Sequence, residues 1–229
     1  MPTTLYWAAA VLAAVFAVIL AGRYRERHAP FYLWWTFSFS FYVIAFVMEA
    51  LTVATNWHLL WQYQLYVIAS SSLVGTMSVG TTYLAVPRRW AHGYAGFIIL
   101  LILGVAVTVF ALPPALHGSW TQLNAGIGGI VGPTQLFYVL MASIGGTVVI
   151  LGALWSWWKT RRLYNLLIAA GALVSTSGGT LASTGIGLSA LPLMNIIGLL
   201  LIFWGYLESR AVPAAGAAAT PRVSSDGRG

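Results

Sequence analysis

Long apolar runs separated by short polar segments dominate the sequence. Each run has roughly the 20 residues that a helix needs to cross the hydrocarbon core of a bilayer. The pattern therefore predicts an all-α integral membrane protein, a bundle of seven transmembrane helices. The predicted spans are about 4–22, 31–53, 60–86, 91–112, 133–157, 163–185 and 188–208. The sixth is the least hydrophobic, with hydroxyl residues and glycines over 175–180, so six spans are the alternative.

Composition and charge agree with this prediction and add an orientation. Hydrophobic residues make up 59% of the chain and charged residues 7%, against about 25% charged residues in soluble domains. The eleven Lys and Arg residues all fall within 23–30, 87–90, 158–162 and 209–229. The positive-inside rule then predicts an N-terminus outside and a C-terminus in the cytoplasm. We expect a multi-pass protein of the plasma (inner) membrane, and basic clusters between apolar runs do not indicate nucleic-acid binding.

Two segments stand apart from the helical pattern. Residues 113–132 contain prolines and glycines and no formal charge, which fits either a lid over the outer face or a plain flexible loop. Residues 211–229 are rich in Ala, Gly, Pro and Ser, and predict a disordered cytoplasmic tail.

One ionisable side chain lies well inside an apolar run. Glu49 falls in the outer third of the second predicted span, where an acid costs several kcal/mol unless it is neutralised, paired or hydrated. Ser38, Tyr42, Ala45 and Thr52 recur with Glu49 at helical spacing. This polar or small stripe should therefore face protein rather than lipid.

Other predicted helices carry polar side chains at a similar depth. Packing could gather them around the acid as a polar pocket, open to the outside, for a small ligand or a cation. The alternative is that each only makes hydrogen bonds between helices, as polar residues in membrane helices often do. The candidate ligand-binding residues are Glu49, Tyr42, Gln64, Gln135, Tyr138 and Asn195.

Cofactor chemistry finds little support. A retinal Schiff base needs a lysine in the last helix, and the one lysine, Lys159, lies in a cytoplasmic linker. A bis-histidine haem needs two histidines at mid-membrane, whereas His28 and His92 lie at cytoplasmic edges and His58 and His117 in outer segments. We therefore expect no retinal, no haem and no metal site. Phosphate loops, HExxH and GxSxG are also missing, which favours a protein that is not an enzyme.

Two stretches resemble a known family. Residues 46–84 and 191–210 are similar to parts of the seven-helix sensor module at the N-terminus of some bacterial histidine kinases. The matching features are Glu49, Trp61, the run from Gln62 to Gln64, the serines from Ser70 to Ser72, and the Trp204–Gly205 pair before the final exit. The resemblance implies a sensory role. Because no kinase domain follows in this sequence, such a sensor would signal through a separate partner.

Three function classes stay open. The leading hypothesis is a sensor or accessory protein whose ligand enters from outside near Glu49 and whose helix movements reach a cytoplasmic or membrane protein partner. A carrier or channel of three-one-three helix plan is the second, and it predicts a polar path continuing past Ser78, Thr82 and Asn165. A structural subunit of a membrane complex is the third. An enzyme using Glu49 ranks last, because no second catalytic group is evident.

Overall fold

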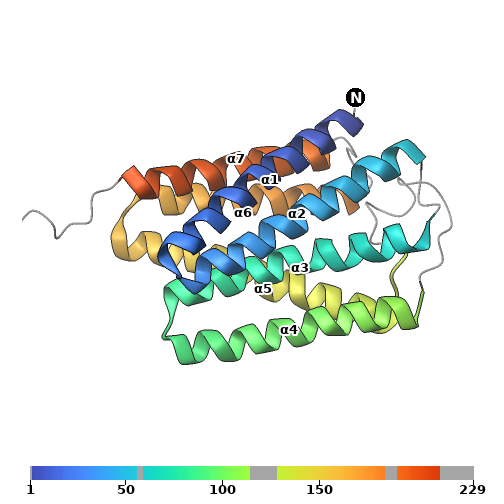
Figure 1. The fold of residues 1–229 in the computed structure, drawn as a ribbon, viewed down its shortest axis with the longest axis horizontal. Helices are drawn as coiled ribbons and strands as arrows, with labels where there is room; N and C mark the ends of the chain where they lie inside the picture. Colours follow the sequence, from blue (N-terminus) through green and yellow to red (C-terminus); the bar gives the residue numbers. More distant parts are fainter. Residues whose placement is uncertain (1, 56–58, 114–127, 184–189, 212–229) are drawn as a thin grey trace, which may run out of the picture.

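The structure, a computed structural model, describes residues 2–55, 59–113, 128–183 and 190–211. Every regular element in these ranges is an α-helix, as the sequence predicts (Figure 1). The helices are α1 (Pro2–Arg27), α2 (Pro30–Thr55), α3 (Leu60–Ala85), α4 (Arg88–Ala111), α5 (Gly132–Thr160), α6 (Leu163–Ser183) and α7 (Ala190–Ala211). The predicted tail and most of the predicted outer lid lie outside the described residues.

The helices have the length and composition of a membrane protein. Five of them, α1, α2, α4, α5 and α7, are long and apolar enough to cross a bilayer. Several extend past the predicted spans; α1 ends at Arg27 and α5 at Thr160. Backbone hydrogen bonding continues beyond the hydrocarbon, since a helix satisfies its own amide groups in water and in lipid alike.

α3 is not among the five helices apolar enough to cross a bilayer, and other helices cover much of its surface. It packs against α2, α4 and α5, and fifteen of its residues are buried. Its hydroxyl side chains bond to nearby carbonyls, as Thr76 does to Ser72 at 2.8 Å. A helix enclosed by other helices gains nothing from hydrophobicity toward lipid, so it tolerates serines and threonines.

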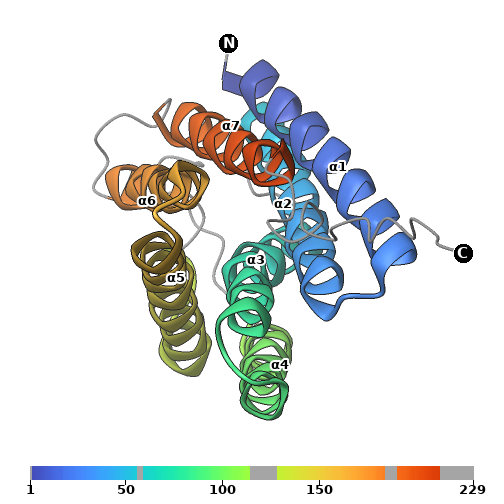
Figure 2. The ribbon, with the colours of Figure 1, turned by 90° about the vertical axis from the view of Figure 1, so that its left-hand side faces the viewer.

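Six helices form a ring. Around it, α1 packs on α2, α2 on α3, α3 on α5, α5 on α6, α6 on α7 and α7 on α1, while α4 lies outside against α3 and α5 (Figure 2). Helices on opposite sides of the ring do not approach each other closely in the described residues. This leaves room for side chains, and for a cavity, at the centre.

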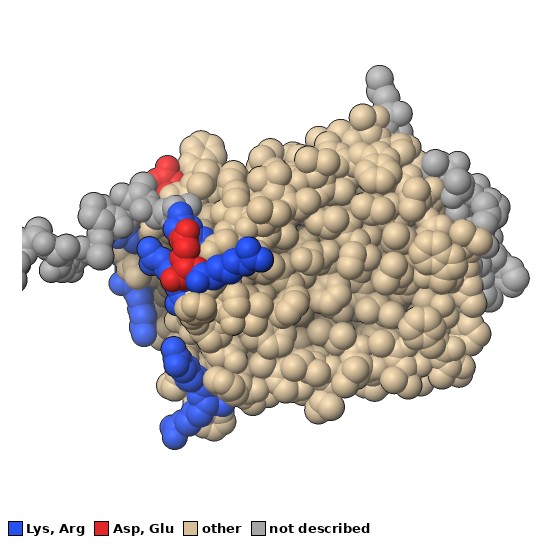
Figure 3. All heavy atoms as spheres, in the orientation of Figure 1, with Lys and Arg blue, Asp and Glu red and all other residues tan. Residues whose placement is uncertain are grey.

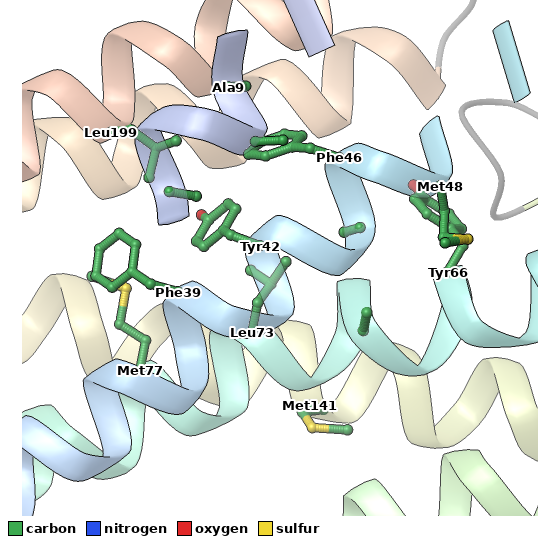
Figure 4. Close-up of a cluster of buried hydrophobic side chains, with 14 of the residues drawn as sticks. Ala9, Phe39, Tyr42, Phe46, Met48, Tyr66, Leu73, Met77, Met141 and Leu199 are labelled. Atoms are coloured by element: carbon green, nitrogen blue, oxygen red, sulfur yellow. The ribbon is translucent and has the colours of Figure 1, made fainter. Parts of the chain in front are cut away.

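Aromatic side chains join three helices on one side of the ring. Phe16 of α1 packs against Phe203 of α7 and Phe39 of α2, with ring centroids 4.0 and 4.8 Å apart. The stack continues along α2 through Tyr42 to Phe46 at 5.9 and 5.5 Å (Figure 4). Buried aromatic pairs of this kind stabilise a fold by about 0.5–1.5 kcal/mol beyond the effect of their burial. The contacts therefore hold α1, α2 and α7 together.

α6 and α7 approach through glycines. A Cβ on Gly171 would lie 2.5 Å from the carbonyl oxygen of Gly198, and one on Gly205 would lie 2.7 Å from that of Tyr164. Small residues allow two backbones to pack this closely where no hydrophobic effect drives helices together. The glycine content of the sixth run thus serves close packing.

Charge gathers at one end of the bundle. The Lys and Arg side chains of the described residues lie around the ends where α1 and α5 finish and α4 begins, and the opposite end carries none (Figure 3). The flank between the ends is apolar, with side chains such as Leu100 and Val107 about two-thirds exposed. An apolar belt bounded by a basic end is the surface expected of a protein embedded in lipid.

Candidate functional site

A cavity of about 330 Å³ lies at the centre of the ring. Residues of α2, α3, α5, α6 and α7 line it, and most of the lining is apolar, including Phe46, Leu73, Met77, Val149 and Ile202. Its polar side chains are Tyr42, Glu49, Tyr66, Ser70, Tyr138, Ser175, Thr176 and Asn195. An apolar cavity with a few convergent polar groups is the usual form of a small-molecule site, and this volume is near the lower end of the range for such sites.

Glu49 is the one charged residue in this lining. Its side chain is buried, with 4% exposed, and the hydroxyl of Tyr66 on α3 hydrogen-bonds to its carboxylate. The second carboxylate oxygen, Oε2, has no hydrogen-bond partner among the described residues. The Lys and Arg side chains that the structure describes all lie toward the basic end, so none of them pairs with this acid.

The predicted polar stripe of α2 does face protein. Ser38, Tyr42, Ala45, Glu49 and Thr52 are all buried, with at most 6% of each residue exposed. Their spacing of three or four residues puts them on one side of the helix. The prediction that this stripe avoids lipid is therefore confirmed.

Tyrosines from facing helices surround the acid. The hydroxyl of Tyr42 on α2 faces Ser175 on α6, and that of Tyr138 on α5 faces Ser70 on α3. Tyr42 extends from α2 toward Leu199 of α7 (Figure 4). Each tyrosine thus gives the cavity an aromatic face and a hydroxyl that can donate or accept.

Four of the six candidate residues line this cavity, namely Tyr42, Glu49, Tyr138 and Asn195. Gln64 does not. Its Nε2 donates to the carbonyl oxygen of Val109 on α4 at 3.1 Å. In a longer helix that carbonyl would accept from residue 113, which is Pro113 and has no N–H.

The structure therefore corrects the expectation that Gln64 gathers around the acid. Positions 64 and 66 of a helix point about 200° apart, since each residue turns about 100°. Tyr66 faces the cavity, and Gln64 consequently faces α4 on the other side of α3. Gln64 instead makes a hydrogen bond between two helices, which is the alternative role for polar residues in membrane helices.

Gln135 is also placed elsewhere. It is exposed in the first turn of α5, where the neighbouring Thr134 is turned inward and buried instead. The first turn of a membrane helix lies near the headgroups, where an amide side chain can be hydrated. The depth of Gln135 along the chain suggested a role in ligand binding, but its side chain lies on the exposed side of α5 and does not line the cavity.

Tyr66 and Ser70 are cavity residues that the sequence analysis did not select as ligands. They share a face of α3 with Leu73 and Met77, which also line the cavity. The spacing 66, 70, 73, 77 is a helical face readable from sequence. Because no residue of α3 from Gln62 to Gly80 is exposed, however, no single face of it stands out as polar or apolar.

A second cavity, of about 270 Å³, lies toward the basic end. Trp35, Thr81, Lys159 and Asn165 are among its lining residues, and Val149 lines both cavities. Asn165 was expected on a path to the cytoplasm and does line this cavity. The two spaces therefore follow one another along the bundle and meet at a valine.

Ser78 and Thr82, also expected on such a path, lie elsewhere. The hydroxyl of Ser78 is 2.9 Å from that of Tyr94 on α4, and Thr82 donates to the carbonyl of Ser78 at 2.8 Å. Ser78 therefore serves the α3–α4 contact, Thr82 bonds within α3, and neither lines the two cavities.

The central cavity offers one carboxylate, hydroxyls and an amide. Within the described residues no three His, Cys, Asp or Glu side chains come together as metal ligands would. A single acid among aromatic rings can hold one positively charged or hydrogen-bonding group. It has no partner acid or base within the lining for proton transfer chemistry.

No protein-family model matches the sequence, and neither a curated protein nor a solved structure was found to match it. The function of the chain is therefore inferred from its own side chains, above all from Glu49 and the cavity around it.

Proposed function

We propose that the chain is a membrane sensor that binds a small ligand from the outer side in the central cavity and signals to a separate protein partner. The observation that carries this proposal is Glu49, an acid buried in a 330 Å³ cavity without a basic partner among the described residues. The similarity of 46–84 and 191–210 to the sensor module of histidine kinases supports the same role class.

The position of the acid is energetically unfavourable without a ligand. Placing a carboxylate at this depth costs several kcal/mol, and leaving one of its oxygens unpaired adds about 1–3 kcal/mol. A structural acid would have its oxygens satisfied by neighbouring donors, just as the buried amide of Gln62 is satisfied by donating from Nε2 to the Thr52 hydroxyl at 3.1 Å. An acid kept in an unfavourable position is better explained by function than by stability.

The proposed topology has seven spans with the N-terminus outside. Among the described residues, α3 and α6 do not meet the length and hydropathy of the other five helices, yet both belong to the same ring as helices that are long and apolar enough to span. With all seven crossing, the ends that carry Arg23, Arg88 and Lys159 share one side, which the positive-inside rule makes cytoplasmic. If α3 did not cross, Arg88 and Lys159 would lie on the side opposite Arg23, and if α6 did not cross, the basic residues of 209–229 would lie opposite all three.

The proposed mechanism is a change in helix packing. Glu49 and Tyr66 belong to α2 and α3, while Tyr138 and Asn195 belong to α5 and α7 across the cavity. A ligand that contacts both sides favours the arrangement in which they are closer, by its difference in affinity for the two arrangements. α3 and α5 lead directly to the basic linkers at 87–90 and 158–162, where a cytoplasmic partner would detect the movement.

Cysteine labelling tests access and topology together, because the natural chain has no cysteine. Val131→Cys lies just before α5, Ala142→Cys in the cavity lining and Thr160→Cys at the basic end. In sealed, right-side-out vesicles, a membrane-impermeant thiol reagent should label the first two and spare the third. Labelling of Thr160→Cys from outside would overturn the topology, and an inert Ala142→Cys would overturn the outward-open cavity.

A carrier is the second candidate, favoured by the two cavities that meet at Val149. If this valine separates outer and inner halves of a path, Ala142→Cys should also react with reagent applied from the cytoplasmic side. Adding Val149→Phe should abolish the reaction from that side and leave the reaction from outside unchanged. For a sensor without a path, Ala142→Cys reacts from the outside alone.

A further inference from the structure

We propose that the central cavity selects a small organic cation, with its ammonium group at Glu49 and its apolar part among the surrounding side chains. This inference deepens the proposed function and rests on it, since it names the chemical class of the ligand. It is carried by the charge of the lining, by its aromatic rings and by its size.

The charge of the lining favours a cation. Glu49 is the one formally charged side chain among the cavity residues, and its Oε2 lacks a hydrogen-bond partner among the described residues. A protonated amine can supply both the opposite charge and the missing donor, and a quaternary ammonium group supplies the opposite charge. An anionic ligand would meet an unscreened carboxylate in a low-dielectric site, where repulsion is strongest.

The aromatic rings favour the same class. Tyr42, Phe46, Tyr66 and Tyr138 all line the cavity with Glu49. The negative faces of aromatic rings attract ammonium groups, and cages of such rings recognise quaternary ammonium ligands. The paired acid and aromatic faces make a site for an organic cation that is more specific than either feature alone.

Size and donor set argue against a metal ion. Ca²⁺ takes six to eight oxygen ligands and Mg²⁺ six, generally with more than one carboxylate or with substrate phosphates. The lining provides one carboxylate, and Leu73, Val149 and Ile202 supply apolar surface that a bare ion cannot use. The volume of about 330 Å³ is about eleven times the share of one liquid water molecule, which suits a small organic molecule.

A pair of thiol reagents of opposite charge tests the selectivity without knowledge of the natural ligand. Ala142→Cys in the cavity lining is exposed to trimethylammonioethyl or to sulfonatoethyl methanethiosulfonate, and each rate is divided by that reagent's rate with free cysteine. We expect the normalised cationic rate to exceed the anionic rate at least about tenfold, since attraction and repulsion at contact differ by more than that even in bulk water. Ser143→Cys lies on the exposed side of α5, which faces lipid in the proposed topology, and should therefore react with neither water-soluble reagent.

Adding Glu49→Gln to Ala142→Cys should bring the two normalised rates to within about twofold. Adding Glu208→Gln, the same change at an exposed position of α7, should leave the ratio as it was. Equal rates in the Ala142→Cys protein would show an accessible cavity without charge selectivity, as when a proton neutralises Glu49. That result overturns the cation inference and leaves the proposed function standing. If neither reagent reacts with Ala142→Cys, the proposed function and this inference are both overturned.

Equilibrium binding gives an independent measure on the otherwise natural chain. Choline and its uncharged carbon isostere, dimethylbutanol, have nearly the same shape and differ in charge. Calorimetry on the purified protein should show choline binding at least about tenfold more tightly, with that preference lost in Glu49→Gln and kept in Glu208→Gln. Equal affinity for the two probes, or binding of neither, overturns the inference.

Discussion

Replacing Glu49 by glutamine should stabilise the ligand-free protein. The glutamine keeps an oxygen that can accept from Tyr66, and it replaces a buried carboxylate, whose Oε2 has no partner among the described residues, by an uncharged amide of nearly the same size. A buried polar group without a partner costs about 1–3 kcal/mol and a charged one costs more, so we expect the uncharged amide to stabilise the fold by about 1–3 kcal/mol. For a chain of 229 residues, 1 kcal/mol corresponds to about 2–4 °C in Tm, so we expect a rise of about 2–12 °C.

The assay is thermal unfolding of the purified protein in one detergent at neutral pH, followed by tryptophan fluorescence. Glu208→Gln makes the same chemical change at an exposed site and should move the free energy of unfolding by no more than about 0.5 kcal/mol. A fall of several degrees in the Tm of Glu49→Gln would refute the reasoning. It would mean that the acid stabilises the fold through a partner, and the functional explanation of its burial would fail.

Three further substitutions test the packing around the site. Gly198→Ala should destabilise the protein by about 1–3 kcal/mol in thermal unfolding, because its Cβ would overlap Ser175 and the backbone of α6, whereas Gly96→Ala has open space and should be neutral or slightly stabilising. Gln64→Leu should cost about 1–3 kcal/mol by leaving a carbonyl of α4 unpaired, while choline binding stays within about twofold of the natural chain. Tyr94→Phe, which removes one hydrogen bond between α3 and α4, should cost about 0.5–1.5 kcal/mol in the same unfolding assay with choline binding unchanged.

The helical class and the inward face of α2 could be read from the chain itself. Hydrophobic runs about 20 residues long have few outcomes other than membrane helices, because lipid forces a backbone to satisfy its own hydrogen bonds. The stripe that contains Tyr42 and Glu49 is predictable for the same reason, since helical spacing fixes which residues share a side. These are local properties, and sequence carries them completely.

Which helix lies opposite which was decided by tertiary packing. Gln64, Gln135 and Asn195 have similar depth and chemistry, yet Asn195 reaches the cavity while the other two point to α4 and to the surface. The difference depends on the rotation of each helix about its axis. That rotation follows from contacts with neighbours far away in the chain, such as the glycine seam of α6 and α7, and no local pattern specifies it.

Charge and depth along the membrane axis are thus written in the sequence, since the bilayer is a solvent with a fixed thickness and a fixed preference for uncharged groups. Which neighbouring helix each side meets within the membrane plane is not, because that depends on how all the helices pack together. The central cavity, the exposure of Tyr66 to it and the meeting of two cavities at Val149 all belong to that second kind of information. These features form only when the helices pack into the ring, because only then does one side of each helix face the centre and the other face lipid.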